Sequence, residues 1–120
     1  MENRDALTVF AALGQPTRLD AFRLLVKAGP DGIGAGALAE MLDVRANTLS
    51  ANLAVLLHAG LVSNRRDGRA IRYFAEMETM RALLAFLLED CCGGRPELCQ
   101  PVLDELACSC GDGVGDDGIV

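Results

Sequence analysis

The sequence predicts a mainly α-helical protein with one small β-hairpin, and three observations lead to this prediction. Apolar residues make up 51% of the 120 residues but aromatic residues only 4%, which favours helices built from Leu, Ala and Val. Leucines recur at helical spacing in several segments. The Asp67-Gly68 pair lies between two short runs with a strand pattern, as in a hairpin.

The first two predicted helices lie on either side of Gln15. Residues 5–13 form a short helix, and its apolar side consists of Leu7, Phe10 and Leu13. Pro16 suits the first turn of the second helix, because an N–H group has no helical partner there. The apolar positions of the second helix are Leu19, Phe22, Leu25 and Val26. A cluster of helix breakers at residues 29–32 ends it.

Two further helices are separated by a short connection at residues 43–46. The first covers residues 35–42, and its expected buried stripe is Leu38, Met41 and Leu42. The second begins at Asn47, and its apolar stripe is Leu49, Leu53, Leu56 and Leu57. It stops at Gly60, because glycine suits the left-handed conformation that follows many helices.

Beyond Gly60 the pattern changes to that of strands. Residues 61–66 and 69–74 are two predicted strands around a tight turn at Asp67-Gly68. A long helix follows over about Met77–Asp90, with an apolar side formed by Met80, Leu83, Leu84, Leu87 and Leu88. A short helix is predicted over about residues 96–107. We therefore expect one domain over residues 1–107 and a flexible tail, rich in Gly and Asp, over residues 108–120.

The net charge of −6 hides an uneven distribution. Residues 1–88 hold ten Arg and Lys against nine Asp and Glu, whereas residues 89–120 hold one Arg against eight acids. Four arginines, opposed only by Asp67, crowd into one short stretch: Arg65, Arg66, Arg69 and Arg72. Salt limits the reach of a charge to about 10 Å, so this patch can bind phosphates despite the distant acidic tail. A solvated hairpin face is the alternative interpretation.

The sequence disfavours two classes of protein. No apolar stretch is long enough to span a bilayer, and the first residues lack the pattern of a secretory signal, so we expect a cytoplasmic protein without a membrane partner. We expect no enzyme, because there is no phosphate-binding loop and the single histidine, His58, has no partnered nucleophile. We expect His58 to lie on the surface.

A short helix, a tight turn, a second helix and a hairpin occur in the order typical of a winged helix-turn-helix domain. In such a domain the second helix reads the major groove of double-stranded DNA with its outer side chains. Opposite the leucine stripe, the predicted second helix exposes short side chains at Asn47, Thr48, Ser50, Ala51 and Asn52. Arg66 and Arg69 are expected at the wing tip, where they would contact the DNA backbone or the minor groove.

Over about residues 6–92 the sequence resembles the ArsR/SmtB family of metalloregulatory repressors. The segments that carry the resemblance are Leu13–Leu19, Asn47–Leu53, Leu57–Val62 and Arg65–Arg69. The resemblance implies a homodimer whose first and last long helices form the interface. It further implies that two recognition helices read an imperfect inverted repeat in an operator, and that an inducer releases the DNA. The family's DNA-contacting positions correspond to Thr48, Ser50, Ala51, Asn52, Arg66 and Arg69.

Five cysteines lie toward the end of the chain: Cys91, Cys92, Cys99, Cys108 and Cys110. In a reducing compartment such thiols favour soft, thiophilic ions, and trivalent arsenic or antimony takes three thiolates in a pyramid. Neighbouring side chains on a helix diverge by about 100°, so Cys91 and Cys92 converge only where Gly93-Gly94 lets the helix fray. We predict a trigonal inducer site of Cys91, Cys92 and Cys99, with Cys108 and Cys110 as accessory thiols or thiols without a role.

The cysteine pattern differs from two better-known metal sites of the family. The predicted last long helix has no histidine, and residues 37–42 lack the Cys-x-Cys-x-x-Cys pattern. Some arsenic repressors of the family are similar in carrying a vicinal cysteine pair and a third cysteine near the C-terminus. We therefore expect a repressor of an arsenic-resistance operon, without a cofactor in the repressing state. A thiol redox switch and an iron–sulfur regulator are the alternatives.

Overall fold

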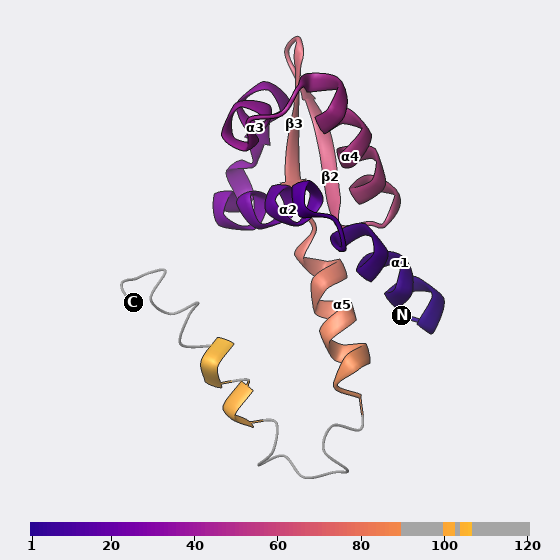
Figure 1. The fold of residues 1–120 in the computed structure, drawn as a ribbon. Helices are drawn as coiled ribbons and strands as arrows, with labels where there is room; N and C mark the ends of the chain where they lie inside the picture. Colours follow the sequence, from indigo (N-terminus) through magenta and orange to yellow (C-terminus); the bar gives the residue numbers. More distant parts are fainter. Residues whose placement is uncertain (90–99, 103, 107–120) are drawn as a thin grey trace. The chain divides into compact units, whose positions relative to one another are not determined.

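Apart from the short additional strand β1, the helices and strands up to α5 follow one another in the predicted order (Figure 1). The computed structural model describes residues 1–89, 100–102 and 104–106. The elements are α1 (Asn3–Leu13), α2 (Pro16–Ala28), the 3-10 helix η1 (Gly29–Asp31), β1 (Ile33–Gly34), α3 (Ala35–Leu42), α4 (Ala46–His58), β2 (Val62–Asp67), β3 (Ala70–Ala75) and α5 (Met77–Leu87). The chain divides into two units, Met1–Leu84 and Ala85–Val120, and the first contains the helix-turn-helix and the sheet.

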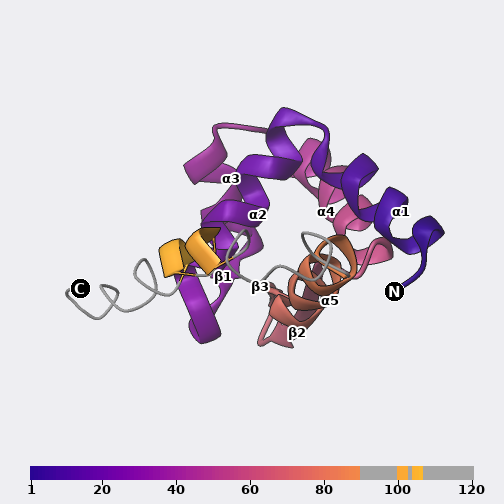
Figure 2. The same cartoon turned by 90° about the horizontal axis from the view of Figure 1, so that it is seen from below.

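Helix α1 buries a different side from the one expected. Its buried residues are Ala6, Val9 and Ala12. Leu7 is 67% exposed and Phe10 46% exposed, while Leu13 is half-buried. Helix α1 packs beside α2 and α4 (Figures 1 and 2), and small buried side chains allow the helices to approach closely. The large apolar side chains Leu7 and Phe10 therefore face solvent.

Helices α2, α3 and α4 pack around a core rich in leucine. The buried residues of these helices are Ala21, Phe22, Leu25, Leu38, Leu49, Leu53 and Leu56. Met41 of the expected stripe is 56% exposed, because α3 is short and only Leu38 points fully into the core. Asp43, at φ 55°, ends α3 in the left-handed conformation, and α4 begins soon afterwards.

Helix α4 ends in the predicted way at Gly60. Gly60 has a φ of 77°, and its N–H group donates to the Leu57 carbonyl at 3.0 Å. The N–H group of Leu61 donates to the Leu56 carbonyl at 3.0 Å. This pair of hydrogen bonds is the Schellman arrangement, which satisfies the last carbonyls of a helix and directs the chain into β2.

The sheet has three antiparallel strands in the order β1-β3-β2. Asp67 pairs with Ala70, so the turn consists of Gly68 and Arg69 rather than the predicted Asp67-Gly68. Of these two residues only Gly68 has a positive φ (69°), which is the pattern of a type II′ turn. Strand β1 was not expected; it is two residues long and pairs Ile33 with Tyr73.

Helix α5 begins at Met77, as predicted, and is attached to the end of α4. Thr79 Oγ1 donates to the Gly60 carbonyl at 2.6 Å, and the N–H group of Glu76 donates to the Leu61 carbonyl at 2.8 Å. The helix ends at Leu87, whereas Asp90, the predicted end, lies outside the described residues.

In the second unit, residues 100–102 and 104–106 are helical, within the span 96–107 predicted as a short helix. The predicted boundary between residues 107 and 108 lies outside the described part. None of the described helices is long and apolar enough to cross a membrane.

Candidate nucleic-acid interface

The outer face of α4 carries short side chains, as predicted. Burial of Leu49, Leu53 and Leu56 turns the opposite side of the helix to solvent. The exposed residues of this face are Asn47, Thr48, Ser50 and Ala51. A helix with such small side chains fits into a major groove and presents hydroxyl, amide and methyl groups to the base edges.

The start of α4 carries exposed side chains with hydrogen-bond donors. Arg45 is the N-cap residue and is exposed, although sequence reasoning did not select it. The Asn47 Oδ1 atom accepts a hydrogen bond from the N–H group of Thr48 at 2.9 Å, so the amide group of Asn47 retains its donors for an external partner. The sequence signal for Arg45 was the position of a basic residue directly before α4. Together with the positive end of the helix dipole, Arg45 makes this end attractive to a phosphate.

The four arginines of the β2–β3 hairpin, Arg65, Arg66, Arg69 and Arg72, fall into two groups. Arg72 Nη1 donates to the carbonyls of Asp31 (3.0 Å) and Gly32 (3.3 Å), and Arg72 Nε donates to Asp67 Oδ2 (3.3 Å). The guanidinium of Arg65 lies over the Phe74 ring, 4.8 Å from its centre. These two arginines therefore hold the hairpin together.

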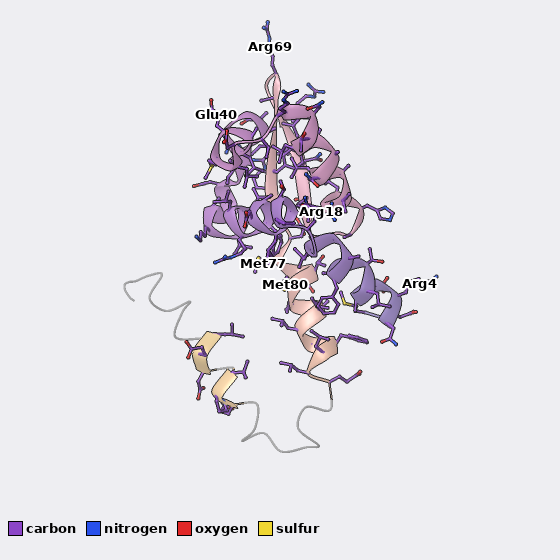
Figure 3. The ribbon with its side chains drawn as sticks, in the orientation of Figure 1. Arg4, Arg18, Glu40, Arg69, Met77 and Met80 are labelled. Atoms are coloured by element: carbon purple, nitrogen blue, oxygen red, sulfur yellow. The ribbon has the colours of Figure 1, made fainter. Side chains whose placement is uncertain are left out.

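Arg66 and Arg69 differ from the other two arginines. Both are exposed, and neither side chain forms a hydrogen bond or salt bridge with the described part of the chain. Arg69 lies in the turn itself and extends away from the unit at the tip of the hairpin (Figure 3). Their charges are available to an anionic partner.

Asn52 is placed differently from the rest of the predicted reading face. It is half-buried, and its Oδ1 atom accepts a hydrogen bond from Arg18 Nη1 at 3.1 Å. Its Nδ2 atom donates to the Thr48 carbonyl at 3.2 Å. Both ends of this amide are therefore bound within the protein. Arg18, which sequence reasoning also missed, belongs to α2.

The predicted inducer site lies outside the described residues. Cys91, Cys92, Cys99, Cys108 and Cys110 all fall there. Among residues 1–89, 100–102 and 104–106, no group of three His, Cys, Asp or Glu side chains is arranged to hold a metal ion. His58 is exposed at the last position of α4, as expected.

Comparison with known proteins agrees with this geometry. A family model described as "Helix-turn-helix domain" matches residues 13–65. No curated protein matches the sequence significantly.

Several solved structures are similar to this chain. An ArsR-like transcriptional regulator from a Rhodococcus species is 29% identical, with 87% of this chain and 93% of that chain covered and a TM-score of 0.63. NolR from Sinorhizobium fredii is 30% identical, with 69% and 81% covered and a TM-score of 0.56. A homodimeric winged helix-turn-helix DNA-binding domain from Mycobacterium bovis, a possible ArsR-family regulator, is 25% identical, with 89% and 91% covered and a TM-score of 0.59. The chain belongs to the ArsR family of winged helix-turn-helix transcriptional regulators.

Proposed function

We propose that the protein is a homodimeric transcriptional repressor that binds an imperfect inverted repeat in double-stranded DNA. The observation that carries this proposal is the common location of the two candidate DNA contacts. The start of α4 and the hairpin tip lie at the same end of the first unit (Figure 1). In this proposal Asn47, Thr48, Ser50 and Ala51 meet base edges in the major groove, and Arg66 and Arg69 meet the backbone or the minor groove.

Two observations support a homodimer. The first is the exposed apolar pair Leu7 and Phe10 on α1, which is the kind of surface that an interface covers. The second is the homodimeric state of the similar domain from Mycobacterium bovis. A dimer presents two recognition helices about 34–36 Å apart, one helical turn of DNA, or a multiple of this distance.

The DNA-binding proposal is tested with an inverted-repeat duplex selected by the wild-type protein from a random library. We expect Arg66→Ala and Arg69→Ala each to weaken binding and to reduce the slope of log affinity against log salt by about one for each phosphate that is no longer neutralised. Lys27→Ala is the matched control, because Lys27 is an exposed cation on α2. A slope that stays the same in both wing variants would exclude the wing from the interface.

The proposed inducer is trivalent arsenic or antimony, bound by the thiolates of Cys91, Cys92 and Cys99. The chemistry of this donor set supports the proposal, because three sulfur ligands match the preference of these elements. Binding near the end of the last long helix would alter the relation between the two subunits and weaken DNA binding, typically by about 5- to 150-fold for such coupling.

Arsenite titration of the protein–DNA complex under strictly reducing conditions tests the inducer. We expect release from wild type and no release from Cys91→Ser, Cys92→Ser or Cys99→Ser, each of which keeps the DNA affinity of wild type. Cys108→Ser and Cys110→Ser are the controls. Release that requires an oxidant instead of arsenite would indicate a thiol redox switch, and iron in the purified protein would indicate an iron–sulfur regulator.

A further inference from the structure

One side chain connects three helices of the first unit. Arg18, near the start of α2, donates from Nε to the Ala12 carbonyl at 2.6 Å and from Nη2 to the Ala11 carbonyl at 3.5 Å. Its Nη1 atom donates to Asn52 Oδ1 on α4 at 3.1 Å. Figure 3 marks this residue at the junction of α1, α2 and α4. A single guanidinium therefore bridges the end of α1 and the middle of the recognition helix.

The chemistry of each contact suits an arginine. The last carbonyls of a helix lack partners within the helix and carry the negative end of its dipole, so a cation with several donors stabilises them. Arg18 supplies these donors at Ala11 and Ala12. A guanidinium has donors only, and its planar fork reaches acceptors in two directions at once. A lysine, with a single nitrogen, does not bridge both sites in this way.

The contact also fixes the amide of Asn52. Because Arg18 offers only donors, Asn52 presents its oxygen to Arg18 and directs its nitrogen to the Thr48 carbonyl one turn earlier. Thr48 lies on the predicted reading face of α4. The hydrogen bonds thus continue from the end of α1 to the turn of α4 that would enter the groove.

We infer that Arg18 is a positioning residue for DNA recognition, and that Asn52 acts as its partner rather than as a contact to the bases. The inference rests on the proposed DNA binding by α4. Helix α1 carries the exposed apolar pair proposed for the dimer interface. A link from α1 to α4 therefore sets the direction in which each subunit presents its recognition helix.

A double-mutant cycle in DNA affinity tests this inference. The variants are Arg18→Gln, Asn52→Ala and their combination, measured on the selected inverted-repeat duplex at several salt concentrations. We expect each single variant to bind about tenfold more weakly and the double variant to bind no more weakly than a single one, because both changes remove the same interaction. The salt slope stays that of wild type, because neither residue neutralises a phosphate in this scheme.

Ser50→Ala provides the matched control for the cycle. Ser50 is exposed on the reading face and forms no hydrogen bond with Arg18 in the described structure. Combined with Arg18→Gln, its effect on affinity should multiply, since the two changes act independently. Arg18→Lys keeps the charge but not the fork, and we expect it to bind DNA as weakly as Arg18→Gln. Should Arg18→Gln fail to fold, Arg18→Lys takes its place in the cycle.

The outcomes separate this inference from the proposed function. A wild-type protein that selects no duplex contradicts DNA binding itself. If wild type binds but the effects of Arg18→Gln and Asn52→Ala multiply, Asn52 contacts DNA directly and the inference is wrong. It is also wrong if the Arg18 variants unfold at lower urea concentration yet bind DNA like wild type while folded, because the residue is then merely structural.

Discussion

At the scale of single residues, Gly32 combines a positive φ with close neighbouring atoms, and Gly29 provides a control for its substitution. Gly32 has φ 66° and ψ −170°, and a Cβ there would meet the Tyr73 carbonyl and lie 2.6 Å from the Phe74 ring. Gly29 has a similar conformation (φ 67°, ψ −147°), but no atom lies within 4 Å of its Cβ position. A comparison of substitutions at the two glycines therefore separates the cost of backbone strain from the cost of steric contact.

We predict that Gly29→Ala lowers the free energy of unfolding by about 1–3 kcal/mol, because only glycine adopts this conformation without strain. Gly32→Ala should lower it by about 1–3 kcal/mol more, since the sheet must move away from the new methyl group. Urea unfolding followed by circular dichroism measures both. Equal decreases in the two variants would mean that β3 moves aside at little cost.

The arginines show how far single residues are predictable from sequence. The basic stretch at residues 65–72 was recognisable, and so was its suitability for phosphates. The division into Arg65 and Arg72, which hold the hairpin, and Arg66 and Arg69, which do not, depends on Phe74 and on the carbonyls of Asp31 and Gly32. These partners come together only in the folded sheet. Arg18 escaped prediction for the same reason, because its partner Asn52 is 34 positions away.

At the scale of elements, the wing gives a prediction in which stability and DNA binding respond to different residues. Arg72→Ala removes hydrogen bonds to Asp31, Gly32 and Asp67, and we expect a decrease of about 1–2 kcal/mol in the free energy of unfolding, moderated by partial exposure. Arg66→Ala should change stability by less than about 0.5 kcal/mol. In DNA binding we expect the opposite: Arg66→Ala reduces the slope of log affinity against log salt, whereas Arg72→Ala leaves this slope as in wild type. Hydrogen exchange of the β2 and β3 amides and salt titrations measure the two effects, and a reduced slope in Arg72→Ala would assign that residue to the interface.

Most elements were predictable because local chemistry specified them. Pro16 marks the start of α2 because its φ is fixed, and Gly60 follows the end of α4 because glycine tolerates a positive φ. The spacing of the leucines determines the buried side of α4. Three features depended on tertiary packing instead. Helix α1 has apolar residues on two sides, so periodicity alone does not decide which side is buried. Strand β1 is too short to have a pattern, and the turn shifted by one residue because Gly68 has a positive φ at the first turn position.

At the scale of the whole molecule, the exposed side of α1 is the proposed dimer interface, on which binding of an inverted repeat depends. Leu7 and Phe10 contribute little to the core of the first unit, being 67% and 46% exposed. Charged residues at these positions should therefore leave the protomer folded. If the two side chains belong to the dimer interface, however, the same change places a charge in an apolar contact and separates the subunits.

We predict that Leu7→Glu combined with Phe10→Glu gives a monomer with the helix content and urea midpoint of an intact protomer. Leu19→Glu is the control, because Leu19 is also an exposed apolar residue (42%) but belongs to α2. Two linked recognition helices bind two half-sites more tightly than one does, typically by a factor of about 10²–10⁴, since the second contact forms within the complex. The double variant should therefore bind the inverted repeat no better than a single half-site. Leu19→Glu should keep the full difference in affinity between the inverted repeat and the half-site. Sedimentation velocity and fluorescence anisotropy on the two duplexes measure both effects, and a double variant that remains dimeric would move the interface away from α1.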